Sequence, residues 1–181
     1  MQAKQATEHI WWVGALDPDL RVFDIIMHSD YGTTYNSYLL RGSQKTALFE
    51  TVKEKFFDQH LEEIRQVMDP ADIDYIVVNH TEPDHSGSVA KMLEIAPNAT
   101  VLGSQTAIAF LKEIVNKPFR HQAVTEKDVI DLGGLSLHFL SVPMLHWPDS
   151  MYTWVPEEKA LFTCDSFGCH YADERVFNDL I

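Results

Sequence analysis

A run of six residues, HTEPDH at positions 80–85, contains four side chains that can bind metal ions. His80, Glu82 and Asp84 occupy alternate positions, so an extended backbone would point all three to one side. A row of three such side chains is too long to surround one ion. A curved loop can instead place them around two neighbouring ions, with His85 facing the second. The alternative is a polar loop before a helix, where acidic residues are common. Four metal-binding side chains in six residues favour the metal site.

Two further candidate ligands follow apolar segments downstream. Asp165 comes directly after ALFTC at 160–164, and a carboxylate at the end of a buried strand is costly unless it is paired or bound to metal. His146 lies in MLHWPDS at 144–150, and by itself it would be interpreted as a core histidine. Together with the cluster at 80–85, both are better explained as ligands. The other histidines are interpreted as structural or exposed, except His170, which lies near Asp165 in the sequence and is a candidate for supporting it.

The elements that must position these residues alternate between strands and helices. We expect strands at 10–13, 22–27, 35–40, 46–50, 75–78, 100–103, 129–132, 135–142, 151–155 and 160–163. Helices are expected at 53–68, from 86 or 88 to 96, at 107–115 and at 173–179. This order predicts an α/β sandwich with helices outside the sheets. Each candidate cluster follows a strand, and strand ends on one rim are where such folds place their chemistry.

Composition narrows the class of protein. A length of 181 residues with 45% hydrophobic residues is typical of one globular domain, and a net charge of −13 argues against nucleic acid or an anionic membrane surface as partner. No apolar run reaches membrane-spanning length, and the N-terminus lacks the apolar core of a signal peptide. Cys164 and Cys169 form neither a zinc-ribbon spacing nor a disulfide framework. We therefore expect a cytoplasmic, reducing location.

The combined motifs resemble those of a known family. The H-x-E-x-D-H pattern, MLHWPDS at 144–150 and CDSFG at 164–168 are similar to the metallo-β-lactamase-like domain of flavodiiron proteins, the cytoplasmic oxygen and nitric oxide reductases. YGTTYNSYLL at 31–40 and RVFDIIM at 21–27 also resemble that family. The likeness covers essentially the whole chain. It implies that residues 1–181 form one metallo-β-lactamase-like αββα sandwich.

The resemblance also implies a ligand set for two iron ions. His80, Glu82 and His146 would bind the first iron, Asp84 and His85 the second, and Asp165 would bridge them, with no catalytic residue beyond these ligands. Hydrolytic members of the wider superfamily carry a histidine in place of Glu82. A carboxylate there makes the site harder and better suited to iron or manganese than to zinc. Tyr35 and Trp147 are candidates for lining the pocket, with large core aromatics as the alternative.

Two parts of the family pattern do not appear in the sequence. These are the last histidine ligand of the second iron, and the C-terminal strands with the flavodoxin-like domain that carries FMN. We therefore expect a truncated domain whose sandwich is incomplete at the C-terminus and whose activity requires an FMN-bearing domain or partner. An incomplete sandwich exposes apolar surface and strand edges, so we also expect a homo-oligomer or association with a complementary chain.

The leading functional hypothesis is a di-iron oxidoreductase domain that reduces oxygen to water, nitric oxide to nitrous oxide, or both. Its electrons would come from FMN through a flavodoxin-like or rubredoxin-type donor. An oxygen-binding di-iron sensor without flavin is the alternative, and a zinc hydrolase of the wider superfamily is a third, against which Glu82 counts. The same ligands serve both gases, and whether the chain alone is an enzyme stays open.

Overall fold

Strands whose residues are buried at nearly every position form the centre of the larger sheet. The computed structural model describes residues 1–180, and this sheet has the order β1-β2-β7-β8-β9-β10-β11. Its strands are β1 (Lys4–Gln5), β2 (Ile10–Trp12), β7 (Tyr38–Arg41), β8 (Thr46–Phe49), β9 (Tyr75–Val78), β10 (Thr100–Gly103) and β11 (His121–Ala123). The last four run parallel. Continuous burial along β8 and β9 follows because both faces of this sheet are covered.

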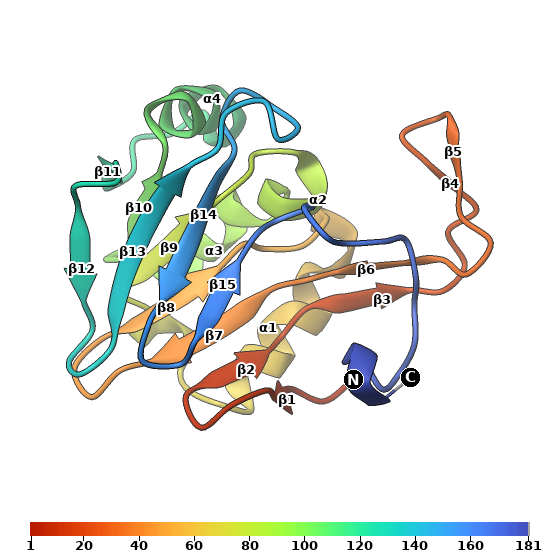
Figure 1. Ribbon diagram of the computed structural model, residues 1–181, viewed down its shortest axis with the longest axis horizontal. Coiled ribbons are helices and arrows are strands. Elements are labelled where there is room, and N and C mark those ends of the chain that lie inside the picture. The colour runs from red at the N-terminus through yellow and green to blue at the C-terminus, as the bar shows by residue number, and fades with distance from the viewer. Residues whose placement is uncertain (181) are drawn as a thin grey trace.

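Helices cover one face of this sheet and a second sheet covers the other (Figure 1). The helical side contains α1 (Phe57–Arg65), α3 (Val89–Ile95) and α4 (Gln105–Val115). The second sheet is antiparallel, with the order β12 (Val129–Asp131), β13 (Ser136–Ser141), β14 (Met151–Val155) and β15 (Ala160–Phe162). Phe49 and Phe162 stack between the sheets with ring centroids 3.8 Å apart. Three layers of the expected αββα sandwich are therefore present in residues 1–180.

The carboxyl ends of the parallel strands meet at one edge of the larger sheet. The register pairs Phe49 with Val77 and Val78 with Gly103, so residues that follow β8, β9 and β10 emerge side by side. Loops of the second sheet reach the same edge, where the Met151 N–H donates to the Asn79 carbonyl at 3.0 Å. Residues distant in sequence are thus brought to one rim. Among residues 1–180, no helix is long and apolar enough to cross a membrane.

Two segments that were expected to form single strands are each divided between two strands in the structure. Residues 22–27 form a hairpin of β4 (Val22–Phe23) and β5 (Met27–His28), because Asp24 and Ile25 adopt positive φ and turn the chain. Residues 35–40 split between β6 (Thr33–Tyr35), which pairs with β3 (Ala15–Asp17), and β7 in the larger sheet. The break falls at Ser37, whose hydroxyl donates to the carbonyls of Phe49 and Glu50.

Three of the four expected helices are shorter in the structure, whereas α4 begins two residues before the expected position 107. Residues 53–68 begin with a 3-10 turn, η1 (Glu54–Phe56), and another turn, η2 (Pro70–Asp72), follows α1. The helix expected at 173–179 is reduced to η3 (Asn178–Leu180), because the Asp173 carboxylate binds both the backbone N–H and the guanidinium of Arg175 and bends the chain. A short helix that the sequence did not predict, α2 (Pro83–Ser86), precedes α3.

Helix α1 buries a histidine that gives the fold a pH dependence. His60 donates from Nδ1 to the Val13 carbonyl at 2.6 Å, and burial lowers its pKa from 6.5 to about 4 despite that hydrogen bond. Because the folded-state pKa lies below the unfolded-state value, the unfolded chain takes up a proton first as the pH falls. The free energy of unfolding should therefore drop by up to about 3 kcal/mol between pH 6.5 and 4.

Urea unfolding at several pH values measures this effect. His60→Asn keeps an N–H donor near the Val13 carbonyl but removes the titrating ring, so the variant should be less stable at neutral pH and lose this part of the acid dependence. An acid slope that is identical in the variant would contradict the assignment to His60.

Candidate metal centre

The cluster at 80–85 occupies the rim where β9 ends. His80 is fully buried, Glu82 is the residue before α2, and Asp84 and His85 lie within α2. The expectation of an extended line of alternating side chains is wrong from Pro83 onward, because proline at the first helical position presets the helical φ. The Ser86 hydroxyl donates to the Thr81 carbonyl at 2.7 Å and closes the turn. This helical turn places Asp84 and His85 beside His80, with the His80 and His85 ring centroids 5.2 Å apart.

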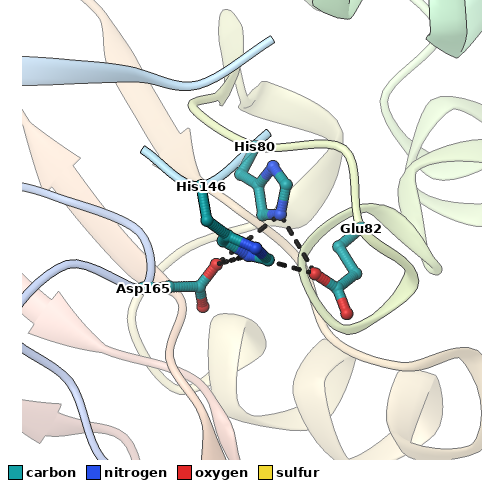
Figure 2. A group of neighbouring side chains, drawn as sticks. All are labelled: His80, Glu82, His146 and Asp165. Atoms are coloured by element: carbon teal, nitrogen blue, oxygen red, sulfur yellow. Dashed lines mark hydrogen bonds and ion pairs between the residues drawn. The ribbon is translucent and has the colours of Figure 1, made fainter. Parts of the chain in front are cut away.

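Four side chains from three segments form a first group: His80, Glu82, His146 and Asp165 (Figure 2). Glu82 Oε2 lies 3.2 Å from His80 Nε2 and 3.4 Å from His146 Nε2. Asp165 Oδ2 lies 3.2 Å from His146 Nε2 and 3.5 Å from His80 Nε2. Two imidazole nitrogens and two carboxylate oxygens thus face a common centre.

Asp84, His85 and Asp165 form a second group beside the first. His85 Nε2 lies 2.8 Å from Asp165 Oδ1 and 3.5 Å from Asp84 Oδ2. Asp165 is the only member of both groups among the described residues, and its two oxygens face different groups. The structure therefore brings all six predicted residues together in two groups that share Asp165.

The electrostatics of the rim favour positive charge at its centre. Burial disfavours a charged His85, but its hydrogen bond to Asp165 and the charges of Asp84 and Glu50 outweigh burial and raise the pKa of His85 to about 10. Burial likewise opposes ionisation of Asp165, yet the hydrogen bond and charge of His85 lower its pKa to about 2. Burial and the neighbouring Asp24 carboxyl raise the pKa of Glu82. Carboxylates are thus crowded here around the imidazoles.

Two buried carboxylates behind the histidines were missed in the sequence. Asp149 Oδ2 lies 3.2 Å from His80 Nδ1 and accepts hydrogen bonds from the backbone N–H and hydroxyl of Thr81. Glu50 Oε2 lies 3.8 Å from His85 Nδ1. A signal for Glu50 was present, because it ends the apolar strand TALFE as Asp165 ends ALFTC. Asp149 had only its place in MLHWPDS.

Three residues were expected around the ligands. Trp147 packs edge-on against the His80 ring, with centroids 5.0 Å apart. The buried Tyr35 donates its hydroxyl to Asp17 Oδ2 at 3.1 Å. His170 Nδ1 lies 3.0 Å from the Thr33 hydroxyl and its ring packs on Phe23. Of the three, Trp147 is the one that contacts a member of the two groups.

The side chains of the two groups are buried on one side of the site and exposed to solvent on the other. The His80 side chain is inaccessible and that of Glu82 is 8% exposed, whereas those of Asp165 and His146 are 38% and 56% exposed. Apolar side chains adjacent in sequence to the two exposed residues also reach solvent: Met144, Leu145, Trp147 and Phe167. The two groups are therefore exposed to solvent on the His146 side, next to apolar surface.

Comparison with known proteins places this arrangement in a family. The family model described as "ODP family beta lactamase" matches residues 33–180. The chain belongs to the ODP family. Flavo-diiron protein FprA2 of Clostridium acetobutylicum is 48% identical over 183 residues, which cover all of this chain and 46% of that protein. Type A flavoprotein FprA of Rhodobacter capsulatus is 43% identical over 95% of this chain and 40% of its own length. The resemblance to flavodiiron proteins is thereby confirmed.

Solved structures confirm the metallo-β-lactamase-like fold of this ODP-family chain. The flavodiiron protein of Giardia intestinalis superposes with a TM-score of 0.95 at 33% identity, over 100% of this chain and 44% of that one. Rubredoxin oxygen:oxidoreductase of the anaerobe Desulfovibrio gigas also gives 0.95, at 35% identity, over 99% of this chain and 45% of that one. The chain spans less than half the length of these relatives.

The ligand atoms of the ODP-family chain fit two adjacent cations. Within each group, the nitrogen and oxygen atoms lie within 4.8 Å of one another. Asp84 Oδ1 is buried without a hydrogen-bond partner, and in residues 1–180 no lysine or arginine forms an ion pair with Glu82, Asp84 or Asp165. Buried carboxylates without such partners are costly unless a metal ion neutralises them. Three carboxylates against three imidazoles form a donor set suited to iron or manganese.

Proposed function

We propose that the chain is the di-iron domain of an oxidoreductase that reduces oxygen to water, nitric oxide to nitrous oxide, or both. His80, Glu82 and His146 would hold the first iron and Asp84 and His85 the second, with Asp165 bridging them. The observation that carries the proposal is the sharing of Asp165 between two groups, one oxygen toward each. The names of similar proteins, flavo-diiron protein and rubredoxin oxygen:oxidoreductase, support it.

Both reactions consume electrons and protons, and neither requires a nucleophilic side chain from the protein. Oxygen takes four electrons and four protons to give two waters, and two nitric oxides take two of each to give nitrous oxide and water. Iron, when bound, supplies the one-electron redox chemistry and open positions for a diatomic molecule. The two buried histidines fix the deep side of the site, and the apolar residues beside His146 and Asp165 suit an uncharged gas.

The electrons would come from FMN on a further domain or a partner, through a flavodoxin-like or rubredoxin-type donor. We also propose a cytoplasmic location, self-association of the chain, and residues 1–181 as one di-iron domain. Trp147, in edge contact with His80, would line the pocket, while Tyr35 and His170 would support the segments beneath it.

Turnover with an added electron donor tests the proposal. Chain purified without oxygen and supplied with a reduced, FMN-containing flavodoxin-like donor should consume oxygen or nitric oxide catalytically. His146→Ala should lower the rate at least tenfold, since second-sphere changes at metal sites already cost about 10–100-fold. His121→Ala, which alters an exposed histidine on β11, should leave the rate unchanged.

Other results would identify other functions. Oxygen binding that changes absorbance without net consumption would point to a sensor. Two bound zinc ions with ester or thioester hydrolysis would point to a hydrolase and would contradict the redox proposal.

A further inference from the structure

Glu50 lies behind the second group, and one of its carboxylate oxygens accepts a hydrogen bond while the other has no partner. It follows β8, is 5% exposed, and adopts a φ of +56° that non-glycine residues rarely take. Its Oε1 accepts the Asn79 N–H at 2.8 Å, which fixes the carboxylate against the end of β9. Its Oε2 is buried and has no hydrogen-bond partner. A buried, unpaired carboxylate oxygen is unfavourable unless a donor reaches it.

The atom that faces this oxygen also has no partner. His85 Nδ1 is buried without a hydrogen bond and lies 3.8 Å from Glu50 Oε2. The other ring nitrogen, Nε2, faces Asp165 and Asp84. A neutral imidazole that uses Nε2 as a ligand carries its proton on Nδ1. That proton requires an acceptor, and Glu50 Oε2 is placed to be one.

The residue after Glu50 fixes the backbone of the same histidine. The N–H and the hydroxyl of Thr51 both donate to the His85 carbonyl, each at 2.7 Å. The Thr51 hydroxyl also accepts the Ser88 N–H at 3.2 Å. The dipeptide 50–51 therefore holds the main chain of His85 while Glu50 faces its ring.

The first group has a parallel arrangement. Asp149 is fully buried, and one of its oxygens faces His80 Nδ1 at 3.2 Å while also accepting from Thr81. Each buried histidine of the two groups thus has a carboxylate from another segment of the chain behind its ring. Carboxylates behind metal-binding histidines fix the tautomer and the ring orientation.

We propose that Glu50 is a positioning residue for the second metal position. In the metal-loaded chain, its Oε2 accepts the Nδ1–H of His85 across a separation that closes from the present 3.8 Å, and so holds the ring with Nε2 toward Asp84 and Asp165. The inference rests on the proposed dinuclear function and adds a role for a residue outside the six ligands.

Anaerobic titration with ferrous iron tests this role through metal affinity. In Glu50→Gln one oxygen still accepts the Asn79 N–H, but the amide nitrogen that replaces Oε2 cannot accept from His85. The first equivalent should bind as in the original chain, and the second should bind about 10–100-fold more weakly. The matched control is Glu63→Gln, a buried carboxylate on α1 whose Oε2 is also unpaired. Both equivalents should bind unchanged in this control, and an unchanged second equivalent in Glu50→Gln would overturn the proposal.

A second measurement keeps the test independent of whether Glu50→Gln folds. In the original chain loaded with diamagnetic zinc, nitrogen-15 NMR of histidines should show His85 protonated on Nδ1, with a downfield, slowly exchanging proton. A rapidly exchanging proton, or protonation on Nε2, would contradict the role of Glu50. If the original chain binds two metals and Glu50→Gln binds both with the same affinities, the inference fails and the dinuclear site stands. If the original chain binds none, both fail.

Discussion

Replacing Asp165 by alanine should remove metal from both positions at once. Asp165 supplies Oδ2 to the group that contains His80 and Oδ1 to the group that contains His85, so one substitution takes an oxygen from each. Second-sphere substitutions at metal sites cost about 10–100-fold in affinity, and a bridging ligand should cost more than the upper end of that range at each position. The proposed reductase activity should fall with the metal content.

Metal analysis after anaerobic purification measures this effect, together with calorimetric titration. Asp19→Ala serves as the control, because Asp19 is an exposed carboxylate in the turn after β3 and lies outside both groups. The control should retain full metal content. An Asp165→Ala protein that kept both metals would refute the bridging role.

Removal of the metals by a chelator should lower the melting temperature by roughly 10–20 °C. A ligand present at 100 times its Kd stabilises the folded state by about 2.7 kcal/mol, so two independent positions contribute about 5 kcal/mol. For a chain of this size, each kcal/mol shifts the melting temperature by about 2–4 °C. Neutralisation of the buried carboxylate of Asp84 is one part of this binding free energy.

Differential scanning calorimetry with and without chelator tests this expectation. Asp165→Ala should melt near the chelated protein and should respond little to chelator. A melting temperature that does not change when metal is removed from the original chain would show that the rim is stable without cations.

The six clustered residues could be predicted because residue type and strand position carried the information. Asp165 follows an apolar strand, and His80 follows another, so the topology of an α/β sandwich brings them to one rim. The local backbone was harder to predict. The run at 80–85 has the alternation of an extended segment, and only Pro83 favours the helical turn that the structure contains.

Glu50 and Asp149 were missed for a different reason. Glu50 and its partner His85 are 35 residues apart in the sequence, and Asp149 and its partner His80 are 69 residues apart. The place of Glu50 after an apolar strand was a signal for the rim, but no local pattern in the sequence shows which histidine each carboxylate contacts. Strand ends were predicted more reliably: β9, β10 and β14 begin and end at the expected residues, because their apolar runs are bounded by polar side chains. The hairpin at 22–28 was misjudged because its exposed isoleucines resemble a buried strand.

The most direct test of the dinuclear iron site is Mössbauer spectroscopy combined with metal analysis on chain enriched in iron-57 and purified without oxygen. The geometry of the two groups, which share Asp165, predicts two irons per chain and, after oxidation, a magnetically coupled ferric pair. One isolated iron per chain, or two zinc ions with no affinity for iron, would contradict the account.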